Sequence, residues 1–116
     1  MKFARLLLVL LAVLTVSVIT LAQTQIIVFA ASSLTDAFEE IAADFEATHP
    51  GVDVLFNFAG SSDLVAQLSE GAPADVFASA NARQMAVARD AERIAGRPRT
   101  FVKNRLVLIV PADNPA

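Results

Sequence analysis

The uninterrupted apolar run at residues 26–31 (IIVFAA) constrains the possible fold more than any other feature of this sequence. A strand with one face in water alternates apolar and polar residues, whereas a strand covered on both faces does not. Because the run is short and ends at Ser32 and Ser33, we interpret it as a buried strand at the centre of a sheet. Such strands are typical of α/β folds, in which helices cover both faces of a mainly parallel sheet.

The next segment has the periodicity of an amphipathic helix followed by a strand. Its apolar residues fall on a single helical stripe: Leu34, Ala37, Phe38, Ile41, Ala42 and Phe45. Ser32 and Ser33 stand where a helix-capping side chain is expected, and Pro50 with Gly51 ends the helical pattern. Residues 52–58 then alternate Val and Phe with other residues, which predicts a second strand.

The remaining residues repeat this order of helix and strand. A second helix around residues 64–68 ends at Gly71, where glycine can adopt a left-handed cap conformation. We expect a third strand at residues 75–78, a third helix at residues 81–91 and a fourth strand at residues 105–110. This alternation predicts the α/β class, with a parallel or mixed sheet flanked by helices and joined by right-handed crossovers.

The first 22 residues have the layout of a secretory signal peptide. Lys2 and Arg5 precede an apolar run that begins at Leu6, and small residues lead to a predicted cut before Gln23. We therefore exclude residues 1–22 from the fold and expect a periplasmic or other extracytoplasmic location. A retained membrane anchor is the alternative, because the apolar stretch approaches the roughly 20 residues that span a bilayer.

The charge and the residue types of the mature chain exclude several kinds of partner. Without Lys2 and Arg5, nine basic residues become seven, against twelve acidic ones, so the net charge is near −5. Nucleic acid is a poor partner for a chain of this charge. The sequence contains no cysteine, which excludes disulfides and thiolate metal sites.

Two serine pairs stand where a predicted strand passes into a predicted helix: Ser32 with Ser33, and Ser61 with Ser62. Ligands of open α/β sheets bind beyond the carboxyl ends of the strands. The loop after the third strand, residues 79–82, belongs to the same edge. Unpaired N–H groups of a first helical turn, together with serine hydroxyls, can hold an anion without a formal positive charge. Helix capping by these serines is the alternative explanation, and Gly60 can be a simple turn residue.

Three blocks carry a resemblance to a known family: residues 27–38 (IVFAASSLTDAF), residues 58–62 (FAGSS, followed by Leu64 and Gln67) and residues 71–80 (GAPADVFASA). In order and spacing they resemble the molybdate-binding proteins of ABC importers, a family of periplasmic solute-binding proteins with the type II fold. The resemblance runs from about Gln25 to Pro111, and the last block is the most specific.

The resemblance implies a fold of two lobes that close around an oxyanion. Residues 23–105 correspond to a first-lobe α/β segment, and residues 106–116 to a strand and the start of the crossover between lobes, where the chain ends incomplete. Ser33 and Ser61 match the family positions whose hydroxyl and N–H groups bind the anion. Ser32 stands where alanine is common, so it is assigned no contact, and an acid at Asp63 departs from the pattern.

The implied activity is capture of molybdate, with tungstate as a possible second ligand, for delivery to the membrane permease of an ABC importer. The resemblance implies no enzyme activity, no cofactor, no direct cation site and a monomer. The family draws further ligand contacts, including a tyrosine, from its second lobe, and this chain has no Tyr. With half of the site, we expect capture by the chain alone to be weak or absent.

Four alternatives stay open at this point. The same fold can bind another anion such as sulfate, and a single lobe can be a fragment that neither closes nor binds, with an exposed edge that promotes aggregation. A hydrolase would need Ser33 or Ser61 as nucleophile with His49 as base, although neither serine lies in a Gly-x-Ser-x-Gly motif. A cation site would use the acids of the first helix, namely Asp36, Glu39, Glu40 and Asp44.

Overall fold

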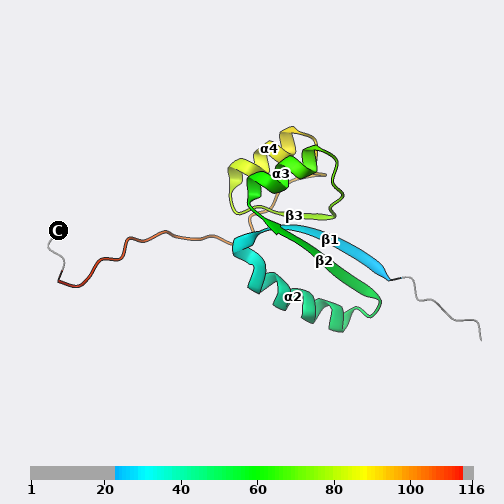
Figure 1. Ribbon diagram of the computed structural model, residues 1–116, viewed down its shortest axis with the longest axis horizontal. Coiled ribbons are helices and arrows are strands. Elements are labelled where there is room, and N and C mark those ends of the chain that lie inside the picture. Colours follow the sequence, from blue (N-terminus) through cyan, green and yellow to red (C-terminus); the bar gives the residue numbers. More distant parts are fainter. Residues whose placement is uncertain (1–22, 114–116) are drawn as a thin grey trace, which may run out of the picture.

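The computed structural model describes residues 23–113, and its core is a small parallel sheet with helices on both faces (Figure 1). The predicted signal peptide at residues 1–22 lies outside the described residues. Within the described range, no helix is both long and apolar enough to cross a membrane. The segment on which the anchor alternative depends also lies outside that range.

The sheet has three strands, β1 (Thr24–Ala31), β2 (Val52–Ala59) and β3 (Val76–Ala78), in the order β2-β1-β3. Both pairings are parallel, and β1 lies in the centre as its apolar run predicts. The register pairs Ala31 with Ala59 and Ala30 with Ala78, so the three strands end at nearly the same level. The loops that follow these strands therefore start at one edge of the sheet.

Four helical elements follow the strands: the 3₁₀ turn η1 (Ser32–Leu34), α2 (Thr35–Thr48), α3 (Ser61–Ser69) and α4 (Ala82–Asp90). Helix α2 lies on one face of the sheet, and α3 and α4 lie on the other (Figure 1). Alternate residues of β1 supply one core cluster to each face. Val28 packs with Ala30 and Ala78 on the α2 side, whereas Phe29 packs with Leu64 on the α3 side. The α/β class is thus confirmed.

Helices α3 and α4 end in the same hydrogen-bonding motif. After α3, the Gly71 N–H donates to Leu68 O and the Ala72 N–H donates to Gln67 O, both over 3.0 Å. Gly71 has φ +98°, which confirms the left-handed cap expected there. After α4, Glu92 and Arg93 make the equivalent bonds, and Glu92 has φ +59° although it is not glycine.

The fourth strand predicted at residues 105–110 is not formed, since residues 101–111 contain neither helix nor strand. Instead the segment runs away from the sheet, and the exposed fraction of its large apolar side chains reaches 93% at Leu106 (Figure 1). An apolar run indicates that a segment is to be buried, but it does not identify the neighbour that buries it. No element among residues 23–113 covers this segment.

The apolar stripe of α2 is likewise only partly covered. Leu34 and Phe38 pack against the core cluster of Val28, and Ala42 is buried. Ile41, however, is 61% exposed, and Phe45 is exposed as well. The sequence pattern therefore predicted the helix and its inward face correctly, while the cover over its second half is missing from the described residues.

Candidate functional site

The three loops at the carboxyl ends of the strands enclose a small hollow of about 290 Å³. Its lining consists of small side chains and backbone, from Ala31, Ser32, Ser33, Ala59, Gly60, Ser61, Ser62, Ala80 and Asn81. Ser33 and Ser61, the two residues expected to bind the anion, therefore lie at the same hollow. Its lining includes no Lys, Arg, Asp or Glu.

Ser61 has a buried polar side chain at the hollow. It is 8% exposed, and no other polar or charged residue among residues 23–113 is buried. Its Oγ accepts a hydrogen bond from the Ala80 N–H over 3.0 Å, which links the loop after β2 to the loop after β3. A hydroxyl that accepts through its oxygen keeps its own hydrogen for donation. The geometry thus leaves one O–H donor available beside the hollow.

Neither serine pair caps a helix in the described part of the chain, so the capping explanation is wrong. The cap residue before α3 is Gly60, with Ser61 already the first residue of the helix, and no side-chain cap bond is formed. Before η1 the cap residue is Ala31, again without such a bond. The exposed Ser33 lies inside η1, where Thr35 Oγ1 donates to Ser32 O over 2.9 Å.

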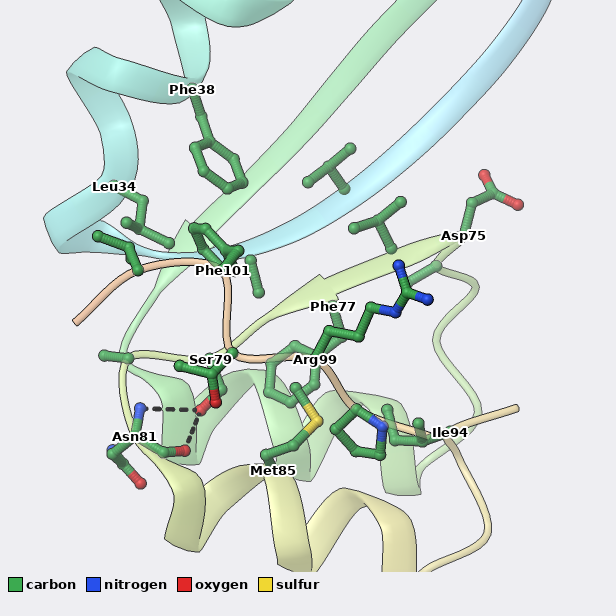
Figure 2. Close-up of a pocket in the computed structure, with 18 of the residues that line it drawn as sticks. Leu34, Phe38, Asp75, Phe77, Ser79, Asn81, Met85, Ile94, Arg99 and Phe101 are labelled. Atoms are coloured by element: carbon green, nitrogen blue, oxygen red, sulfur yellow. Dashed lines mark hydrogen bonds between the residues drawn. The ribbon is translucent and has the colours of Figure 1, made fainter. Parts of the chain in front are cut away.

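The third loop, which sequence reasoning named only as a whole, contributes Ala80 and Asn81 to the lining of the hollow. Asn81 caps α4, because its Oδ1 accepts from the Gln84 N–H over 2.9 Å. Ser79 Oγ donates to Asn81 O over 2.9 Å and accepts from the Asn81 N–H over 3.3 Å (Figure 2). Ala80 contributes a backbone N–H, which no side chain in the sequence indicates. Asn81 could have been predicted at the hollow, because it is a polar residue that follows the end of a predicted strand.

Asp63 lies beside the hollow without lining it. A Cβ placed on Gly60 would come 3.1 Å from Asp63 Oδ2 and 3.8 Å from Ser62 Oγ. The carboxylate therefore folds back over the first turn of α3, toward the Gly60 backbone that forms part of the wall. Gly60 has φ −60°, a value open to any residue, so its backbone conformation does not require glycine.

Asp75, the acid of the most specific sequence block, has a structural contact instead of a place at the hollow. Its Oδ2 accepts from the Ile27 N–H over 2.8 Å, and its own N–H donates to Ile27 O over 2.8 Å. This two-point contact extends the pairing of β1 with β3 by one residue. The contact holds the short strand β3 against β1, and β3 leads into the loop whose residues Ala80 and Asn81 line the hollow.

The geometry argues against the two other chemistries considered. His49 stacks on Phe45 with ring centroids 4.0 Å apart, directly after the far end of the 14-residue helix α2. A helix of that length is about 21 Å long, so His49 cannot act as a base for Ser33 at the other end. Within residues 23–113, no group of three or more His, Asp or Glu side chains is arranged to hold a metal ion.

A larger groove of about 1,500 Å³ is lined by α2, the sheet, α4 and the segment around Arg99 (Figure 2). Apolar side chains make up most of its wall, and Phe101 packs on Phe38 with ring centroids 6.1 Å apart. Ser33 borders this groove as well as the hollow. An oxyanion needs many hydrogen-bond donors to replace its water, so the small hollow suits it and the large groove does not.

A parallel sheet with an uncharged hollow at the ends of its strands is the arrangement of a protein that binds a small solute, and the sequence comparisons agree. Residues 26–116 match the family of bacterial extracellular solute-binding proteins, and the chain belongs to that family. Among the similar proteins are several named as molybdate-binding proteins. The molybdate-binding protein ModA of Mycobacterium tuberculosis is 51% identical over 90 residues, which are 78% of this chain and 34% of that protein.

Two further proteins support the same relationship. ModA of Escherichia coli is 46% identical over 88 residues, covering 75% of this chain and 34% of the relative. A solved structure described as the substrate-binding domain of a molybdenum ABC transporter from Clostridium difficile superposes with a TM-score of 0.56 at 31% identity, over 58% of this chain and 29% of that one. The resemblance to molybdate-binding proteins is confirmed. The chain spans about a third of the length of these relatives.

Proposed function

We propose that this chain supplies the first-lobe half of a molybdate site in an exported solute-binding protein that delivers the anion to an ABC importer. The observation that carries the proposal is the meeting of both serine loops at one uncharged hollow. The 51% identity to a molybdate-binding protein supports molybdate as the ligand. Tungstate is the second ligand we include, because it has the same shape and charge.

The chemistry of the hollow suits a fully ionised tetrahedral anion. Serine hydroxyls and the N–H groups of a first helical turn donate hydrogen bonds, and the partial positive potential of the turn adds to them. Ser33 and Ser61 donate from two different loops, so that the anion is held from two directions. A protonated phosphate would also need an acceptor, which donor groups of this kind do not provide. The anion is cargo, and no covalent step or cofactor takes part.

Capture in this proposal is completed by a second lobe, with the 116-residue chain providing one wall of the site. The hollow is open to solvent, and all of its lining comes from the loops at the carboxyl ends of the three strands. Closure of two lobes around a ligand is a hinge motion that removes the remaining water from the anion. The matched stretch is 34% of each of two relatives, so these proteins are more than twice as long as this chain, which leaves length for such a lobe in a protein of their kind.

The test is isothermal titration of the protein from Gln23 onward with molybdate, using sulfate and phosphate as control anions. Replacing Ser33 or Ser61 by Ala removes one charge-assisted hydrogen bond, so we expect a loss of roughly 1.5–3 kcal/mol of affinity, about 10- to 150-fold. Ser69→Ala is the matched control, because the Ser69 hydroxyl donates to Val65 O at the other end of α3.

Three results would contradict parts of the proposal. Unchanged affinity in both serine variants would remove Ser33 and Ser61 from the site. Tighter binding of sulfate than of molybdate would assign the protein to another anion. A folded protein that binds none of the three anions would mean that this lobe does not form a site of its own.

A further inference from the structure

Asp63 is an acidic residue whose side chain folds back toward Gly60, a residue that lines the serine hollow. Its Oδ2 lies so close to Gly60 that an added Cβ would come within 3.1 Å, and Gly60 and Ser62 both form part of the wall. The residue is exposed and stands in the first turn of α3, directly after Ser61 and Ser62, which line the hollow. Its charge therefore acts on the space that an anion would occupy.

Nothing in the described chain neutralises this carboxylate. Among residues 23–113 the one ion pair joins Arg89 to Asp90, both on α4. The sequence from residue 23 to residue 82 contains no Lys or Arg, so neither serine loop brings a cation near. The positive end of the α3 dipole is the main favourable partner of Asp63, and the same dipole end would attract the ligand.

We propose that Asp63 limits the affinity of the serine hollow for a dianion by competing with it for the positive end of α3. The inference rests on the proposed anion-binding function and names the residue that tunes it. The carboxylate stabilises the helix while it repels the ligand, so removing its charge has opposite effects on folding and on binding. For a carrier that must release its cargo, a lower affinity speeds release, because affinity differences lie mostly in the dissociation rate.

The expected size of the effect follows from elementary electrostatics. A single charge about 8 Å from a dianion in a largely aqueous environment changes its binding by about three- to tenfold. Salt screens such an interaction, since the Debye length at 0.1 M is about 10 Å. Asp63→Asn should therefore bind molybdate about three- to tenfold more tightly at low salt. This gain should shrink toward unity near 1 M salt.

The experiment compares Asp63→Asn with Glu70→Gln in molybdate titrations of the protein from Gln23 onward, at low and high salt. Glu70 is an exposed acid on the cap after the other end of α3, about 14 Å along the helix from Ser61, so its variant makes the same charge change farther from the hollow. Thermal unfolding without ligand is measured in parallel. We expect Asp63→Asn to unfold at a lower temperature and to bind more tightly, and Glu70→Gln to give a clearly smaller gain in affinity, because the Coulomb energy falls with distance and salt screens it further.

The outcomes separate this inference from the function on which it rests. If wild type binds molybdate and Asp63→Asn binds equally or more weakly at low salt, Asp63 does not limit affinity and the inference fails alone. The same holds if Glu70→Gln gives an equal gain, because the effect would then come from net charge. If folded wild type and Asp63→Asn both give no heat with molybdate, the proposed function fails for this chain.

Discussion

Glu92 has an unfavourable backbone conformation, since it is the one non-glycine residue among residues 23–113 with a positive φ. It follows α4 at the position where Gly71 follows α3, and both ends make the same pair of hydrogen bonds. A side chain in the left-handed region costs about 1 kcal/mol relative to glycine. Because the two helix ends have similar geometry but different residues, Gly71 shows what Glu92 would gain by becoming glycine.

We expect Glu92→Gly to stabilise the fold by about 0.5–1 kcal/mol, measured as the free energy of unfolding in urea. Glu70→Gly is the control, because Glu70 has φ −76° and gains nothing from the freedom of glycine. That control should be destabilised by a similar amount. Equal shifts of the two variants in one direction would contradict the assignment of strain to Glu92.

The sequence indicated which residues would lie at the hollow only where a side chain marks the position. Ser33 and Ser61 lie at the expected hollow, because a serine next to a strand end is visible in the sequence. The Ala80 N–H, which bonds to Ser61, comes from the backbone and leaves no such signal. The capping prediction failed for a related reason. The chain makes a 3₁₀ turn at Ser32–Leu34, and a cap depends on backbone angles that serine alone does not determine.

At the scale of secondary-structure elements, the weakest part of the site is the three-residue strand β3. It pairs with β1 at Val28, Phe29 and Ala30, and the contact between Asp75 and Ile27 extends that pairing. β3 leads directly to the loop of Ala80 and Asn81. The carboxylate of Asp75 therefore helps to place one wall of the hollow from a distance.

Asp75→Ala should cost about 1 kcal/mol of folding free energy and lose the exchange protection of the Ile27 amide, because the N–H then has no acceptor. Hydrogen exchange followed by NMR measures the amide directly. Asp75→Asn keeps a carbonyl oxygen in the same place and should retain most of the protection. If Asp75→Ala leaves exchange at Ile27 unchanged, the side-chain contact is not what holds β3.

The elements themselves were largely predictable, since each depends on its own periodicity. β1, β2, α2 and α4 begin and end within a few residues of the predicted bounds, and α3 starts earlier, at Ser61. The strand predicted at residues 105–110 was not formed, because a strand needs a neighbouring edge as well as an apolar run. Whether an amphipathic helix forms depends mainly on the local sequence pattern, whereas whether a strand forms depends also on a neighbouring strand with which it can pair.

At the scale of the whole molecule, the described chain exposes an unusual amount of apolar surface. Leu106, Leu108 and Ile109 are each more than 85% exposed, and Ile41 on α2 is 61% exposed. Extended apolar segments with unpaired backbone groups associate with one another through added strands. A protein that consists of residues 23–116 should therefore self-associate, unless residues beyond them cover this surface.

Replacing Leu106 and Leu108 together by Lys should shift residues 23–116 from self-association toward monomer at micromolar concentration, as measured by sedimentation velocity. The two positive charges interrupt the apolar run and repel one another between chains. Ala112→Lys adds one positive charge just after the run and controls for charge alone. If the control dissolves the assemblies as well as the double variant does, net charge governs association. If neither variant changes the sedimentation, the contact lies elsewhere, with the exposed face of α2 at Ile41 as the next surface to alter.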